Sequence, residues 1–248
     1  MKYQVYSYRY AEEILQHPNN REAYDEIVAA VENVPLFTYA GKSKRNAKLD
    51  VVQQVMNTWF DRELSVERRW LYHPAATTIK GSGLAADFRK TFDNITVQAE
   101  VQFGNMSRWY SDVFKFQTAY SQGLIDVGLC IVPMGVLGRR IDSNVVSYER
   151  ILRELPSAKM SLTLPILVIG IEPDEQTETI DLKRIAGIPF SRLINSAAKT
   201  GGGQSEHNRY RVIQALREEG DPYLVDETSD TGPMAKAIIA EEPIDNGD

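Results

Sequence analysis

The chain has 248 residues, 43% of them hydrophobic and 25% charged, with a formal net charge of −6. This length fits one sizeable domain or at most two small ones, and the composition is that of a soluble globular protein, which excludes fibrous and wholly disordered classes. No apolar run approaches the roughly 20 residues of a membrane helix. The N-terminus has no apolar signal core, and the single cysteine, Cys130, excludes an intramolecular disulfide. We therefore expect a cytoplasmic protein without membrane association.

The negative charge comes from the end of the chain. Residues 226–248 hold seven acidic residues against one base, Lys236, whereas residues 1–225 hold 27 acidic and 27 basic residues. We expect residues 1–225 to form a single domain and residues 226–248 a flexible acidic tail. A domain that is neutral overall can still present a basic cleft to DNA. Three histidines and one cysteine, widely separated, do not provide a zinc site, so carboxylates must hold any metal ion.

Helical patterns fill the first third of the chain, and strands alternate with helices after Pro74. Apolar residues at helical spacing predict helices within residues 10–15, 21–34 and 51–64. The later sequence predicts strands at residues 95–103, 125–132 and 166–171, and helices at about 107–122 and 148–155. Helices that separate apolar strands imply parallel connections, so the predicted class is α/β, a central sheet flanked by helices.

Strict alternation marks the strand at residues 95–103. One face carries Val97, Ala99, Val101 and Phe103, and the other carries Thr96, Gln98, Glu100 and Gln102. This period of two predicts a strand with one buried face. On the helix that follows, Trp109, Val113, Phe116 and Tyr120 form a stripe that favours core packing over a dimer interface.

A pair of carboxylates can be placed from the turn that precedes this strand. Asp93-Asn94 suits a two-residue hairpin turn, and that register sets Asp87 opposite Glu100. Opposed residues have Cβ atoms about 5 Å apart, and the sequence offers no cation between these two. A divalent cation or a retained proton would relieve their repulsion, and Gln102 points to the same side. Hard oxygen ligands of this kind favour Mg²⁺ over zinc. The alternative is an ordinary solvated hairpin, with Asp87 and Glu100 paired to Arg89 and Lys90.

Two motifs decide between these interpretations. Asp87-Phe88-Arg89-Lys90, followed by Glu100-Val101-Gln102-Phe103, resembles the active-site hairpin of the BglII/BstYI-like type II restriction endonucleases, members of the PD-(D/E)xK superfamily. The resemblance covers roughly residues 8 to 173. It implies a restriction-endonuclease-like mixed central sheet flanked by helices, with a helical N-terminal part.

The interval from Asp to Glu departs from that pattern, because it is four residues longer here. Asp93 is therefore an alternative ligand. Four inserted residues can lengthen both hairpin arms by two, which keeps the face of every side chain, so we favour Asp87.

The resemblance implies Mg²⁺-dependent hydrolysis of double-stranded DNA at a short palindrome, which by extrapolation contains GATC, by a homodimer. Asp87, Glu100 and the carbonyl of Val101 would hold the metal, and Gln102 would orient the attacking water. Contacts that read the DNA sequence are implied at Asn105, Ser143 and Asn144. Arg108, Arg139 and Arg140 are expected from their charge to contact phosphates, and for Arg139 and Arg140 a solvated surface is the alternative. For Asn105, Ser143 and Asn144, a helix cap or a turn is the alternative role.

Two other function classes stay open from the sequence. One is a repair nuclease of the same superfamily or a catalytically silent DNA-binding relative. The other is a nucleotide-binding α/β protein, since Gly81-Ser82-Gly83-Leu84-Ala85-Ala86 follows the β-like residues 77–80 and reads G-x-G-x-x-A. The short segment between these glycines and the next strand disfavours it.

Overall fold

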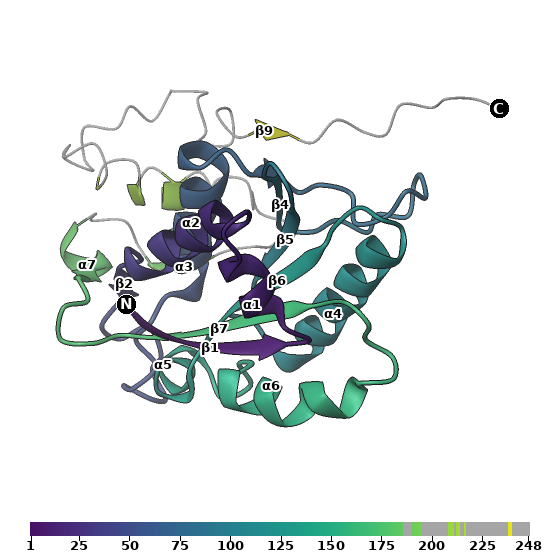
Figure 1. Cartoon of the computed structure of the whole chain (residues 1–248). Coiled ribbons are helices and arrows are strands. Elements are labelled where there is room, and N and C mark those ends of the chain that lie inside the picture. The colour runs from purple at the N-terminus through teal and green to yellow at the C-terminus, as the bar shows by residue number, and fades with distance from the viewer. Residues whose placement is uncertain (186–189, 195–207, 211, 214–215, 217–237, 240–248) are drawn as a thin grey trace.

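A computed structural model describes residues 1–185, 190–194, 208–210, 212–213, 216 and 238–239. Within these residues, a seven-stranded mixed sheet forms the centre, in the order β1-β7-β6-β5-β4-β3-β9 (Figure 1). Its strands are β1 Lys2–Tyr8, β7 Ile166–Glu172, β6 Val127–Pro133, β5 Thr96–Val101, β4 Phe88–Thr91, β3 Leu71–Tyr72 and β9 Ile238–Ile239. The strands β2 (Leu36–Thr38) and β8 (Thr179–Asp181) pair separately and in parallel.

The helices connect and cover these strands. They are α1 Ala11–Gln16, α2 Arg21–Glu32, α3 Gln53–Phe60, α4 Met106–Ser121, α5 Gly135–Ile141, α6 Tyr148–Glu154, α7 Leu182–Ile185 and α8 Phe190–Ile194. A π-helical segment, Asp61–Glu67, continues α3, and a 3-10 turn, Leu155–Ala158, continues α6. Within the described ranges, no helix is long and apolar enough to cross a membrane.

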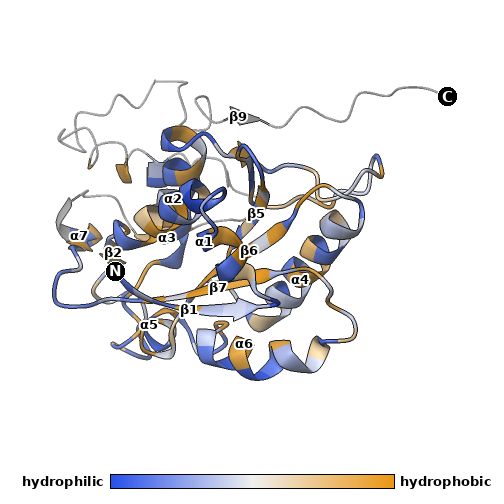
Figure 2. Ribbon diagram, in the orientation of Figure 1, coloured by the Kyte–Doolittle hydropathy of each residue, from blue (hydrophilic) through white to orange (hydrophobic). Residues whose placement is uncertain are grey.

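Each face of the sheet has its own hydrophobic core. Strands β5, β6 and β7 are parallel and lie at the centre, where Figure 2 shows hydrophobic residues concentrated on the strands. Alternate residues of β6 point to opposite cores: Leu129 and Ile131 pack with α2 and α3, whereas Cys130 and Val132 pack with α4 and α6. A parallel centre buried on both sides explains why β6 and β7 are almost uniformly apolar.

The predicted central elements are confirmed, and the N-terminal edge of the sheet is where the sequence analysis was wrong. Residues 2–8, within the expected helical third, form β1, which pairs antiparallel with β7 from Lys2↔Glu172 to Tyr8↔Ile166. The helix α5 was not predicted either, because it is short and contains Gly135 and Gly138. Residues 226–248 lie outside the described residues except for Ile238 and Ile239, so the expected tail remains a prediction.

The expectation that β5 buries only one face is wrong. Gln98 and Glu100 on its polar side are 0% and 1% exposed, as deeply buried as the apolar residues opposite. The cause is α4, which lies against this side of the sheet (Figure 1). A buried polar atom without a hydrogen-bond partner destabilises the fold. The hydrogen-bond and ion-pair partners of Gln98 and Glu100 therefore determine the properties of this face.

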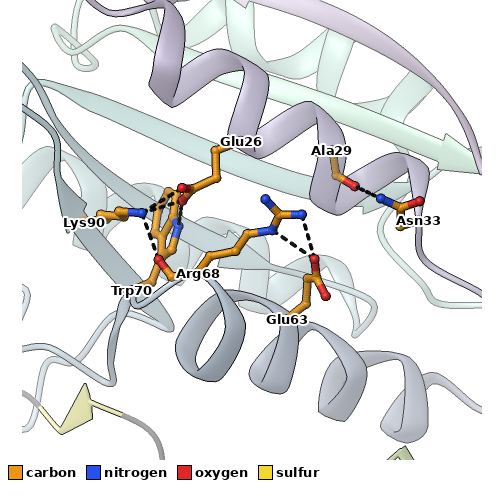
Figure 3. A network of polar contacts seen from close by, with 7 residues as sticks. All are labelled: Glu26, Ala29, Asn33, Glu63, Arg68, Trp70 and Lys90. Atoms are coloured by element: carbon orange, nitrogen blue, oxygen red, sulfur yellow. Dashed lines mark hydrogen bonds and ion pairs between the residues drawn. The ribbon is translucent and has the colours of Figure 1, made fainter. Parts of the chain in front are cut away.

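The opposite side of the hairpin is fixed by a polar network (Figure 3). Lys90 Nζ donates to both carboxylate oxygens of Glu26, at 2.8 and 2.7 Å, and to the carbonyl of Arg68 at 2.8 Å. Trp70 Nε1 donates to the same Glu26, and Arg68 pairs with Glu63. On the face that also carries Gln98 and Glu100, Arg89 donates to the carbonyl of Ala75 and to Gln98 Oε1. Lys90 and Arg89 are therefore occupied elsewhere, and the interpretation as a solvated hairpin with Asp87 and Glu100 paired to them is wrong.

Close packing at Gly170 allows a test of the core. A Cβ atom at Gly170 in β7 would collide with the ring of Tyr148, whereas one at Gly138 in α5 would find nothing closer than 3.8 Å. We expect Gly170→Ala to lower the free energy of unfolding by about 1–3 kcal/mol through overpacking. Gly138→Ala should be neutral or raise it by about 0.5–1 kcal/mol, because alanine favours the helix. Urea unfolding of both variants measures the difference, and equal effects would contradict this account of the packing.

Candidate active site

The hairpin has the predicted register. The pairs Phe88↔Ala99, Arg89↔Gln98, Lys90↔Val97 and Thr91↔Thr96 all occur, and Phe92 N donates to the carbonyl of Ile95 at 2.8 Å. Asp87 directly precedes β4, so the same register places it opposite Glu100. Its Oδ2 accepts a hydrogen bond from Val101 N at 3.0 Å, which draws it to the end of β5. Asp93, in contrast, lies exposed in the turn.

Two residues of α4 complete a cluster that the sequence analysis missed. Lys115 Nζ lies 2.5 Å from Glu100 Oε2 and 2.9 Å from Asp112 Oδ1. Asp112 and Lys115 are 4% and 8% exposed. The expectation that no cation lies between the carboxylates is therefore wrong, because the cation comes from the helix that covers the strand. Asp112 follows the buried Trp109 by three residues and precedes Phe116 by four, a spacing that could have identified it on the buried face.

The amide of Gln102 is held at both ends. Its Nε2 donates to Asp112 Oδ2 and its Oε1 accepts from Gly104 N, each at 2.8 Å. These bonds fix the side chain beside the carboxylates.

Burial and crowding of negative charge change the acidity of the cluster. Burial, together with the neighbouring Asp87 and Asp112, raises the pKa of Glu100 to about 10. Burial also raises the pKa of Asp87, against the opposing effects of Lys115 and the Val101 N–H. Burial alone would lower the pKa of Lys115. The negative charges of Glu100 and Asp112 have the opposite and larger effect, so the pKa of Lys115 is raised. Three carboxyl groups thus surround one ammonium group, an arrangement that favours an additional proton or cation beside them.

A cavity of about 320 Å³ opens beside this cluster. Its walls include Gln53 and Asn57 of α3, Asp87, Val101 and Gln102 of the hairpin, and Arg108, Asp112 and Lys115 of α4. Asn57 Oδ1 is buried without a hydrogen-bond partner in the described part of the chain. Neither α3 residue was predicted from the sequence, because only the tertiary fold brings this helix to the hairpin.

The donor set fits a magnesium ion. Glu100 Oε1 is buried and has no hydrogen-bond partner among the described residues, so one carboxylate oxygen is left for a cation. Those residues contain no cluster of three or more His, Cys, Asp or Glu side chains arranged to hold a metal. Magnesium does not require one, since proteins usually hold it through one or two carboxylates and waters.

The predicted sequence-reading residues lie close together. Asn105 forms an isolated antiparallel bridge with Val145, and Val146 N donates to the carbonyl of Gly104, so the loop with Ser143 and Asn144 lies beside Asn105. All three side chains are exposed. Asn105 also caps α4, since its Oδ1 accepts from Arg108 N at 3.3 Å. Ser143 and the backbone of Asn144 bond to Asp142 in a turn. Their alternative roles as cap and turn are thus present in the structure.

The three candidate arginines differ in their surroundings. Arg108 lines the cavity, and Arg139 is exposed at the end of α5. Arg140 makes a two-pronged ion pair with Asp50, at 2.9 and 2.7 Å. Arg140 therefore has less freedom than Arg108 or Arg139 to contact a phosphate.

The nucleotide-binding interpretation is wrong. Residues 77–80 form no strand, and no helix follows Gly81 and Gly83 before β4 begins at Phe88. Both glycines have positive φ, 70° and 66°, a conformation that glycine adopts readily in turns and loops. A dinucleotide-binding unit needs a helix directly after its glycines, which this loop lacks.

Comparison with known proteins identifies the family and the fold of the chain. The family model described as "Restriction endonuclease BglII/BglIII" matches residues 3–171. A crystal structure of restriction endonuclease BglII complexed with a DNA 16-mer is similar with a TM-score of 0.57 and 20% sequence identity, over 71% of this chain and 81% of that chain. The structure of free BglII gives a TM-score of 0.49 at 20% identity, over 71% and 82%. No protein of curated function matches in sequence.

Proposed function

This chain belongs to the BglII/BglIII family of restriction endonucleases and is a type II site-specific deoxyribonuclease, and from that premise we propose that it cleaves double-stranded DNA with Mg²⁺ held by Asp87 and Glu100. The observation that carries this proposal is the register that sets Asp87 opposite Glu100 while Glu100 Oε1 stays unpartnered. A cation shared by both carboxylates would relieve their repulsion.

Each residue of the site has a proposed task. Asp87, Glu100 and the carbonyl of Val101 would hold the ion, which when bound lowers the pKa of a water and stabilises charge on the phosphate. Gln102 would orient water through its remaining amide hydrogen and carbonyl lone pair, since its other bonds go to Asp112 and Gly104. Arg108, in the cavity wall, would pair with a phosphate.

Sequence reading is proposed for the exposed amide and hydroxyl groups beside the site. Asn105, Ser143 and Asn144 lie together, and an Asn amide can bond adenine in the major groove. Arg139 would contact the DNA backbone, and Arg140 would do so only if it leaves Asp50. The proposed recognition sequence is a palindrome that contains GATC. We also propose that the enzyme is cytoplasmic.

Digestion of unmethylated plasmid and phage DNA tests the function. With Mg²⁺ we expect discrete fragments, and with EDTA or with Glu100→Ala none. Sequencing of the fragment ends then gives the site. A smear would indicate cutting without sequence specificity, and an absence of Mg²⁺-dependent cleavage would refute the proposed function.

A homodimer is proposed because two strands of a palindrome must be cut. The outer side of α4 exposes Tyr110 and Phe114 at 52% and 62%, whereas Trp109 and Phe116 are buried in the core as predicted. Adjacent exposed aromatic residues are typical of a surface that pairs with another protein. We expect Phe114→Lys to shift sedimentation from dimer to monomer. Ile79→Lys, at a residue 66% exposed in the loop that precedes β4, should leave the dimer intact.

A further inference from the structure

The ammonium group of Lys115 occupies the centre of the carboxylate cluster. It lies 2.5 Å from Glu100 Oε2 and 2.9 Å from Asp112 Oδ1, and the side chains of Lys115 and Glu100 are 11% and 1% exposed. In the described residues no second lysine or arginine forms an ion pair with Glu100 or Asp112. Lys115 is thus their neutralising charge in this structure.

A simple structural ion pair does not account for the whole arrangement. A buried Lys–Glu pair is electrically neutral by itself. Here Asp87 and Asp112 add two further carboxyl groups next to that pair. Glu100 Oε1 has no hydrogen-bond partner in the described chain, although an unpartnered buried oxygen is costly. Lys115 also lines the cavity, which a purely structural ion pair need not do. The cluster therefore has the charge and the open oxygen for a second cation.

We propose that Lys115 is an internal substitute cation, which stabilises the metal-free cluster and competes with a divalent metal ion for Glu100. This inference rests on the proposed function, because it takes Glu100 as a metal ligand. A positive charge a few ångströms from a metal site repels the metal, so Lys115 lowers metal affinity while it keeps the carboxylates together. The protein thereby folds without metal.

Calcium binding to metal-free protein measures this competition without any cleavage reaction. We expect Lys115→Met to bind Ca²⁺ about tenfold or more tightly than the unchanged protein in calorimetric titration, since loss of the nearby charge removes repulsion. Its melting temperature in EDTA should fall, and Ca²⁺ should raise it by more than in the unchanged protein. Lys159→Met, at an exposed lysine, should change neither quantity.

Two further variants keep the test decisive. Lys115→Gln retains a hydrogen-bond donor for Glu100 and replaces the methionine variant if that protein does not fold. The double variant Glu100→Gln/Lys115→Met should lose Ca²⁺ binding, because it lacks the carboxylate that the metal shares. Ca²⁺ affinity that is unchanged or weaker in the Lys115 variants would overturn the proposal, as would an absence of Ca²⁺ binding in every protein. DNA cleavage by the unchanged protein is scored separately, so specific cleavage with unchanged Ca²⁺ affinity in the variants refutes this inference alone.

Discussion

Replacing Glu100 by glutamine is expected to lower the rate of DNA cleavage by about 10³-fold or more, because a lost metal ligand removes several kcal/mol of transition-state stabilisation. Glutamine has the same shape, and its carbonyl oxygen can still accept the bond that Lys115 donates to Glu100. The variant should therefore fold and bind DNA. Single-turnover cleavage with Mg²⁺ gives the rate, and a gel-shift experiment in EDTA gives the binding.

The matched control is Glu22→Gln, at an exposed glutamate in the first turn of α2. It makes the same carboxyl-to-amide change at a residue that does not line the cavity, and it should change the rate by less than about twofold, as surface substitutions usually do. Equal cleavage by Glu100→Gln and the unchanged protein would exclude Glu100 as a ligand. Loss of DNA binding together with cleavage would indicate instead that the variant does not fold.

The register of the hairpin could be predicted from the sequence because β-pairing across a tight turn is local. Once Asp93-Asn94 is taken as the turn, every opposed pair of β4 and β5 follows, and all four are found. The alternation along β5 likewise identified which residues share a face. The central strands β6 and β7 were recognised from their apolar runs alone.

Features that depend on long-range packing were not predictable in this way. The pattern of β5 contains no information about what covers it, so its polar face was expected to be solvated, whereas α4 buries it and contributes Asp112 and Lys115. Asn57 reaches the cavity through the position of α3. Strand β1 is defined by its pairing with residues more than 150 positions away, and its alternating, half-exposed sequence is a weak local signal. Arg140 was expected to contact DNA, and its ion pair with Asp50 could not be predicted from the sequence.

One pair of equivalent substitutions can decide whether Asp87 or Asp93 is the metal ligand. Asp87→Asn is expected to reduce cleavage by about 10²–10³-fold, because an amide is a poorer metal ligand than a carboxylate and carries no charge. The asparagine oxygen can still accept the bond from Val101 N, so the hairpin should keep its register. Asp93→Asn should leave the rate within about twofold, since asparagine is as well suited to the exposed turn as aspartate.

The same pair of variants tests how the longer hairpin is accommodated. If the four additional residues lengthen both arms by two, Asp87 stays at the end of β4 beside the end of β5, as the observed pairing indicates. If they instead formed a loop that returned Asp93 to Glu100, the paired run from Phe88 to Thr91 could not form, because Asp93 would have to leave the turn between the strands. Loss of cleavage in Asp93→Asn with full activity in Asp87→Asn would therefore contradict both the ligand assignment and the register on which it depends. Circular dichroism and melting curves of the two proteins confirm that a difference in rate reflects the site and not the fold.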